Sequence, residues 1–332
     1  MPARCLLGKP RCATIAAMNL AADGAIDTES ELERELRGGL FAVTAELSPP
    51  VATDPREFVA QALPLRGLAT AVNVTDGAAA KAHMSALAAA HFLVRNGIEP
   101  ILQITCRDRN RLALQGDLLG AAALGIRNIL VLRGDDPGTG DQPDAKPVFD
   151  LEATTLLAMA DGMRSERRLP SGTEIHGPVN FFLGAADIPV DPPSGWRAER
   201  LAAKAAAGAD FVQTQFCMDL GVVRRYAERL LELGIAQELP ILIGVAPIPS
   251  ARSARWMREK LFGTLIPDDI VARLEKSSDP KREGKRICIE LMRELAEIPG
   301  IAGAHVMAPR SHAAIAEVLA AAGVRGRPRA AI

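Results

Sequence analysis

A run of charged and flexible residues directly follows one of the most apolar segments of the chain. The segment 128–132 (NILVL) has the composition of a buried strand, and Arg133, Gly134, Asp135 and Asp136 come immediately after it. A guanidinium and two carboxylates at the carboxyl end of a parallel strand can bind and orient a polar small molecule, as in α/β active sites. A turn with a helix cap is the alternative for this segment taken alone.

Other strand ends along the chain also carry polar side chains. Each of them has a structural interpretation when taken singly: Glu46 as a partly exposed strand end, Gln215 as a core amide, Arg310 as a surface charge. Lys204, on a helix that ends before Gly208, is by itself a solvated helix residue. Together, the strand-end residues come from six segments and would converge on one rim; they are Glu46, Thr75, Asp76, Gln103, Thr105, Arg133, Asp135, Gln215 and Arg310.

Eight strand-like segments, each followed by at least one helical pattern, position these residues. The strand segments are 41–47, 70–74, 100–105, 128–132, 179–184, 210–216, 241–247 and 302–308. This alternation predicts a single (β/α)8 TIM barrel over residues 29–332, with extra helices before strand eight and a mobile N-terminal extension over 1–28. A doubly wound sheet with an additional domain is the structural alternative. The patterns also predict a helix over about 80–96 and Asp108 as a helix cap.

Composition excludes several classes of function. Lys plus Arg total 39 against 40 for Asp plus Glu, and aromatics make up 4%, so we expect neither a nucleic-acid partner nor a membrane partner. The five scattered cysteines and five histidines lack metal-ligand spacing, which predicts no metal site, no disulfide framework and a cytoplasmic location. The glycines after residue 133 match neither a dinucleotide fingerprint nor a P-loop.

Six motifs at these rim positions carry a resemblance. They are TAELSPP (44–50), VNVTDGA (72–78), LQITCRDRN (102–110), LLGAAALGIRNILVLRGDDP (118–137), AAGADFVQTQF (206–216) and VMAPR (306–310). With them the chain resembles the methylenetetrahydrofolate reductase family, flavin-dependent barrels of one-carbon metabolism, over about 41–325. The resemblance implies reduction of 5,10-methylenetetrahydrofolate to 5-methyltetrahydrofolate for methionine biosynthesis, with FAD as cofactor, NADH or NADPH as electron donor, and a homo-oligomeric assembly.

The resemblance also assigns roles to individual residues. Glu46 matches the catalytic glutamate, the general acid on N10 of the bridged folate, and Asp135 matches the aspartate that contacts the pterin. Gln215 matches a folate-contacting glutamine, and Arg310 falls where the family carries an active-site arginine. The positions that match flavin contacts are Thr75, Gln103, Leu132, Arg133, Gly134 and Lys204.

Two departures from the family pattern, besides a difference at Gln103, leave alternatives open. Gln103 stands at a position that is histidine in better-known bacterial members. The segment GAADIP (184–189) lacks the tyrosine that stacks near the flavin, and Ala251 stands where they have a substrate-stacking phenylalanine. One alternative is therefore a flavin-independent enzyme that passes hydride directly from NAD(P)H to the folate. A second is a folate-binding barrel that acts only within a larger complex.

Overall fold

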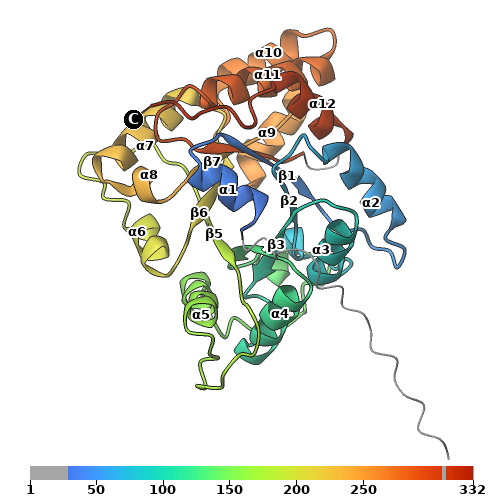
Figure 1. Ribbon diagram of the computed structural model, residues 1–332. Coiled ribbons are helices and arrows are strands. Elements are labelled where there is room, and N and C mark those ends of the chain that lie inside the picture. Colours follow the sequence, from blue (N-terminus) through green and yellow to red (C-terminus); the bar gives the residue numbers. More distant parts are fainter. Residues whose placement is uncertain (1–28, 309–311, 332) are drawn as a thin grey trace, which may run out of the picture.

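The computed structural model describes residues 29–308 and 312–331, and within them eight parallel strands close into a barrel (Figure 1). Each strand pairs with the next along the chain, and β8 pairs with β1 through Ala42↔Gly303. The strands are β1 (Ala42–Leu47), β2 (Ala71–Val74), β3 (Pro100–Thr105), β4 (Asn128–Leu132), β5 (Phe182–Asp187), β6 (Phe211–Phe216), β7 (Ile241–Val245) and β8 (Gly303–Val306). The predicted (β/α)8 barrel is confirmed.

Helices surround this barrel, and the main apolar core lies between them and the outer face of the strands. Three helices, α9 to α11, separate β7 from β8, as the sequence predicts. The α-helices are α1 (Glu31–Arg37), α2 (Arg56–Ala62), α3 (Ala86–Arg95), α4 (Arg111–Ala123), α5 (Ala153–Ser165), α6 (Glu199–Ala206), α7 (Leu220–Glu232), α8 (Ile235–Glu238), α9 (Ala251–Lys260), α10 (Asp268–Lys276), α11 (Pro280–Leu295) and α12 (Ala313–Ala322). The 3-10 turns are η1 (Leu63–Leu65), η2 (Ala78–Ala80) and η3 (Pro137–Thr139).

Helix α1 closes the amino-terminal end of the barrel. Its buried Leu32 and Leu36 pack in a second apolar cluster with the first residues of the strands, such as Ala42 and Ile101. Glu99 accepts hydrogen bonds from the Glu31 amide (2.6 Å) and the Leu32 amide (2.9 Å), which satisfies the first N–H groups of the helix. Burial raises the pKa of the Glu99 carboxyl above its ordinary value. Among the described residues, apolar side chains therefore fill this end of the barrel.

Three details of the secondary structure differ from the sequence prediction. The fifth strand begins at Phe182, three residues later than predicted, because its first ladder bond runs from the Phe182 amide to the Arg127 carbonyl. The predicted helix over 80–96 begins only at Ala86, since Ala80 adopts left-handed backbone angles. Asn110, rather than Asp108, caps α4 by accepting from the Ala113 amide at 3.1 Å.

Two further predictions relate to the limits of the described chain. The predicted extension over 1–28 and the candidate residue Arg310 both lie outside the described residues. Within residues 29–308 and 312–331, no helix is long and apolar enough to span a membrane.

Candidate active site

Glu46 lies at the carboxyl-terminal rim, one residue before the end of β1. Its side chain is 23% exposed, and its Oε2 accepts a hydrogen bond from Gln103 Nε2 at 2.9 Å. His305 on β8 places Nε2 at 3.7 Å from the same oxygen. Glu46 and Gln103, both predicted site residues, are therefore in direct contact, and Glu46 is the ionisable member.

A buried polar network fills the barrel interior beneath Glu46. The sequence analysis did not single out three of its members, Thr44, Asn73 and Gln213. Gln213 Nε2 donates to Thr44 Oγ1 (2.9 Å) and to Asn73 Oδ1 (3.0 Å), while Asn73 Nδ2 donates to Gln213 Oε1 (2.6 Å). Thr44 Oγ1 lies 2.9 Å from His305 Nδ1. All four side chains are almost fully buried. The interior therefore changes from an apolar layer near α1 to a hydrogen-bonded layer under the rim.

Asp76 joins the carboxyl ends of β2 and β3. Its Oδ2 accepts from the Thr105 amide (2.8 Å) and hydroxyl (2.9 Å) and pairs with Arg109, which also binds Asp117 at 2.8 Å. The neighbouring Thr75 is buried, and its Oγ1 has no hydrogen-bond partner among the described residues. Asp76 is thus occupied in a structural brace, whereas the Thr75 hydroxyl can take a ligand group.

The segment after β4 is exposed at the rim. The Arg133 guanidinium lies 4.2 Å from the Phe149 ring centroid and 3.5 Å from Glu152. Gly134 has φ +90°, a backbone conformation that side chains disfavour, and an added Cβ would lie 2.9 Å from Arg107 Cβ. The backbone angle and the contact with Arg107 therefore account for a glycine at position 134. Leu132, at the end of β4, is half-buried.

Asp135 connects this segment to the loop after β2. Its exposed carboxylate accepts from the Ala79 amide through Oδ2 at 2.8 Å. A few residues on, Gly140 packs so closely on the same loop that an added Cβ would lie 2.1 Å from the Ala80 carbonyl oxygen. The long loop after β4 and the loop after β2 therefore form one packed unit beside the rim.

Gln215 projects from an irregular part of β6. The register between β6 and β7 shifts between Gln213 and Phe216, and the Thr214 hydroxyl accepts from the Gly244 amide (3.0 Å) at this point. Gln215 Oε1 accepts from its neighbour, the Phe216 amide (3.0 Å). Its Nε2 donates to the Phe262 carbonyl (3.3 Å), and the Phe262 side chain is 86% exposed. Phe262, which the sequence analysis missed, is an exposed aromatic residue whose backbone adjoins Gln215.

Lys204 on α6 lies against the end of β5. Its Nζ donates to the Ala186 carbonyl (2.5 Å) and pairs with Asp187 (2.9 Å), and Asp187 also accepts from the buried Tyr226 hydroxyl (2.7 Å). Burial, followed by the Asp187 charge, raises the Tyr226 pKa well above its ordinary value. The lysine charge is therefore already compensated by Asp187. Ala251, which stands where the family pattern has a phenylalanine, is buried at the start of α9.

The histidines give no indication of a metal centre. Within residues 29–308 and 312–331, no group of three or more His, Cys, Asp or Glu side chains could hold a metal ion. His83 instead contacts backbone groups on both sides of its ring. Its Nε2 accepts from the Gly77 amide (2.7 Å), and its Nδ1 lies 2.6 Å from the Met84 carbonyl oxygen. Burial lowers the pKa of His312, and the Glu46 carboxylate opposes this shift.

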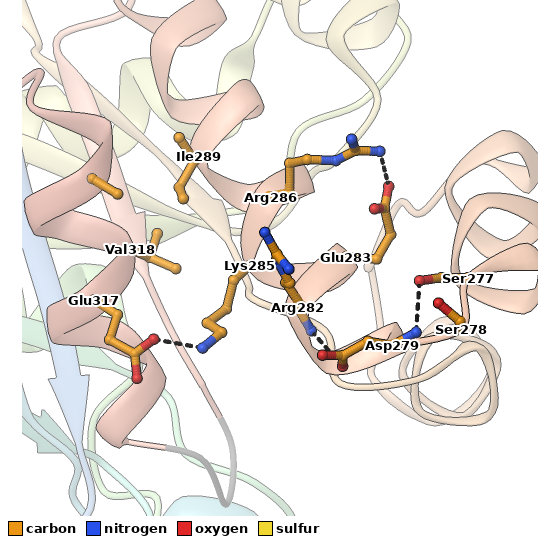
Figure 2. A pocket seen from close by; sticks show the side chains of 11 residues that line it. Ser277, Ser278, Asp279, Arg282, Glu283, Lys285, Arg286, Ile289, Glu317 and Val318 are labelled. Atoms are coloured by element: carbon orange, nitrogen blue, oxygen red, sulfur yellow. Dashed lines mark hydrogen bonds and ion pairs between the residues drawn. The ribbon is translucent and has the colours of Figure 1, made fainter.

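A separate hollow of about 600 Å³ lies on the outer helical layer between α10, α11 and α12 (Figure 2). The charged residues around it bind one another, with Lys285 to Glu317 at 2.5 Å and Arg286 to Glu283 at 2.8 Å. Asp279 accepts from the Arg282 amide as the cap of α11. This hollow is a solvated surface groove, and the rim of the barrel remains the candidate active site.

Comparison with known proteins identifies the chain's relatives. The family model described as methylenetetrahydrofolate reductase matches residues 31–323, from α1 to the end of α12. The chain is 31% identical over 253 residues to a probable methylenetetrahydrofolate reductase (NADPH) of Caenorhabditis elegans, a match that covers 74% of this chain and 35% of that protein. It is 27% identical over 166 residues to the 5,10-methylenetetrahydrofolate reductase of Salmonella typhimurium, a match that covers 48% of this chain and 48% of that protein. The matches thus span about a third to a half of these relatives' length.

Two solved structures share the fold at low identity. An uncharacterised protein from Clostridium thermocellum that binds two copies of 5-methyl-5,6,7,8-tetrahydrofolic acid has a TM-score of 0.60 at 14% identity, over 88% of this chain and 98% of that chain. An F420-dependent secondary alcohol dehydrogenase has a TM-score of 0.51 at 11% identity, over 85% and 99%. Both likenesses concern the barrel fold. The match of the family model over nearly the whole barrel shows that the chain belongs to the methylenetetrahydrofolate reductase family.

Proposed function

We propose that this protein reduces 5,10-methylenetetrahydrofolate to 5-methyltetrahydrofolate, with NADH or NADPH as electron donor and FAD as bound cofactor. The observation that carries the proposal is Glu46, a partly exposed carboxyl group at the barrel rim that Gln103 holds in place. This group lies within the match to the methylenetetrahydrofolate reductase model. The names of the relatives support the reaction, and one of them specifies NADPH.

The rim residues fit a flavin. Thr75 offers a buried hydroxyl that lacks a partner among the described residues, and Arg133 offers a guanidinium that is 56% exposed. When bound, the flavin would accept hydride from the nicotinamide and pass it to the folate. The residues that would hold it are Thr75, Gln103, Leu132, Arg133, Gly134 and Lys204.

Glu46 would protonate N10 of the bridged folate, which opens the five-membered ring. Gln103 Nε2 donates to Glu46 Oε2, so the amide stabilises the carboxylate that remains after proton transfer. Asp135 would accept N–H groups of the pterin, and its negative charge would stabilise positive charge on the opened substrate. Gln215 would contact the folate on the β6 side, and we extend the same role to Arg310 from the family resemblance.

Direct hydride transfer without flavin is the second candidate, and the environment of Lys204 favours it. Asp187 compensates the lysine charge at 2.9 Å, so Lys204 presents less net positive charge to a flavin phosphate. Ala186 and Ala251 also supply no aromatic ring at the two positions where the family pattern has one. In this candidate the nicotinamide would occupy the rim together with the folate.

Anaerobic absorption spectroscopy of the purified protein tests the proposal. An absorption band at about 450 nm that bleaches with NADH or NADPH and returns on addition of methylenetetrahydrofolate supports flavin-dependent reduction. A protein that neither contains nor binds flavin, yet oxidises NAD(P)H only when the folate is present, supports direct transfer. If the protein does not oxidise NAD(P)H in a folate-dependent way, either as purified or with FAD added, both candidates are refuted.

A further inference from the structure

The hydrogen bonds in the barrel interior determine which ring nitrogen of His305 carries the proton. Gln213 Nε2 has two hydrogens, and they are directed at Thr44 Oγ1 (2.9 Å) and Asn73 Oδ1 (3.0 Å). Asn73 returns a bond to Gln213 Oε1 at 2.6 Å, so the two amides hold each other in one orientation. The Thr44 oxygen therefore acts as an acceptor from Gln213.

This leaves the Thr44 hydroxyl hydrogen for His305. Thr44 Oγ1 and His305 Nδ1 are 2.9 Å apart. With the Thr44 hydroxyl as its donor, Nδ1 is an acceptor, and the proton of the neutral imidazole is on Nε2. The Nε2 atom lies 3.7 Å from Glu46 Oε2, so its N–H group is on the side of the carboxylate.

Two N–H donors thus approach one oxygen of the glutamate. Glu46 Oε2 accepts a hydrogen bond from Gln103 Nε2 at 2.9 Å, and the His305 N–H group faces it at 3.7 Å, beyond hydrogen-bond distance. An oxygen that faces N–H donors is a poor place for the acid proton, because the proton would meet those donors. The protonated form of Glu46 therefore carries its hydrogen on Oε1.

We propose that Asn73, Gln213 and Thr44 form a positioning chain that fixes the His305 tautomer and, through it, places the proton of Glu46 on Oε1. This inference deepens the proposed function, on which it rests for its catalytic consequence. These three side chains and His305 are buried beneath the rim. They would act by orienting Glu46 and not by contact with the substrate.

The Thr44→Val variant tests the chain with little change in side-chain volume. Without the hydroxyl, Nδ1 loses its donor and the tautomer is no longer fixed. We expect the rate constant for folate reduction to fall about tenfold, a fraction of the 10²–10⁴ that a positioned acid contributes. The KM for folate and the reduction of bound flavin by NAD(P)H are expected to stay within about twofold.

The matched control is Thr70→Val, which removes another buried threonine hydroxyl. Thr70 Oγ1 donates to Glu35 at 2.6 Å and accepts from the Val43 amide at 3.0 Å, near the amino-terminal end of the barrel. Its loss is expected to leave folate reduction unchanged. Equal losses in the two variants would show a general structural effect and overturn the proposal.

Nitrogen NMR of histidine-labelled protein measures the tautomer directly and independently of turnover. The His305 signal, assigned by its loss in His305→Gln, is expected to show a protonated Nε2 and an unprotonated Nδ1. A proton on Nδ1 would mean that the amides point the other way and would overturn the proposal. His305→Gln keeps an N–H donor, so it is expected to lose less folate reduction than His305→Leu; equal losses would also count against the chain. Absence of folate reduction in the unmodified protein would instead refute the proposed function.

Discussion

Replacement of Asp76 by Asn tests the brace between the carboxyl ends of β2 and β3. The Asp76 Oδ2 atom accepts from the Thr105 amide and hydroxyl and pairs with the Arg109 guanidinium. An asparagine oxygen keeps the two bonds from Thr105. The substitution therefore removes mainly the negative charge that faces Arg109, beside the candidate site residue Thr75.

The exposure of the pair determines the expected size of the effect. Breaking a buried ion pair costs about 3–5 kcal/mol, and breaking an exposed one costs about 0–1 kcal/mol. The Asp76 and Arg109 side chains are 14% and 21% exposed, and Arg109 keeps Asp117 at 2.8 Å. We therefore expect the free energy of unfolding to fall by about 2 kcal/mol and Tm to fall by about 4 °C.

Urea denaturation followed by circular dichroism measures this loss. The matched control is Asp191→Asn, because Asp191 bonds Arg225 at 2.7 Å on the surface, where the two side chains are 57% and 53% exposed. We expect this control to lose less than about 1 kcal/mol. A loss in Asp76→Asn no larger than that of the control would refute the assignment of Asp76 as a buried brace.

Three further predictions concern single side chains. Gly140→Val should raise the KM for folate several-fold with little change in Tm, since its Cβ would lie 2.1 Å from the Ala80 carbonyl; an unchanged KM in steady-state assays would contradict it. Burial raises the Cys217 pKa to about 12, so native protein at pH 8 should resist iodoacetamide there, as peptide mass spectrometry can check. Lys204→Met should lower stability by about 1–3 kcal/mol in urea, because it leaves Asp187 without its cation.

The strands and their polar ends could be predicted because they depend on local sequence. A buried parallel strand such as β4 is a continuous apolar run, and the charged residues after it mark its end. The start of β5 could not be placed from the same signal, since Val179 and Phe181 are apolar and buried but precede the first ladder bond. Pairing with β4, a contact distant in sequence, sets that boundary.

The interior network carried a signal that the sequence analysis did not use. Thr44 and Glu46 are two residues apart on β1, and Gln213 and Gln215 are two apart on β6. Residues at this spacing share one face of a strand, so a rim residue indicates an interior partner two positions earlier. The bond from the Ala79 amide to Asp135, in contrast, depends on loop backbone angles and could not be predicted in this way.

The measurement that tests the account most directly is the pre-steady-state comparison of Glu46→Gln with the unmodified protein. The glutamine keeps the size of the side chain but has no acid proton to give N10. We expect folate reduction to fall by at least about 10²-fold while reduction of bound flavin by NAD(P)H stays nearly intact. Equal losses in the two half-reactions, or folate reduction at the unmodified rate, would contradict the role of Glu46 as the general acid.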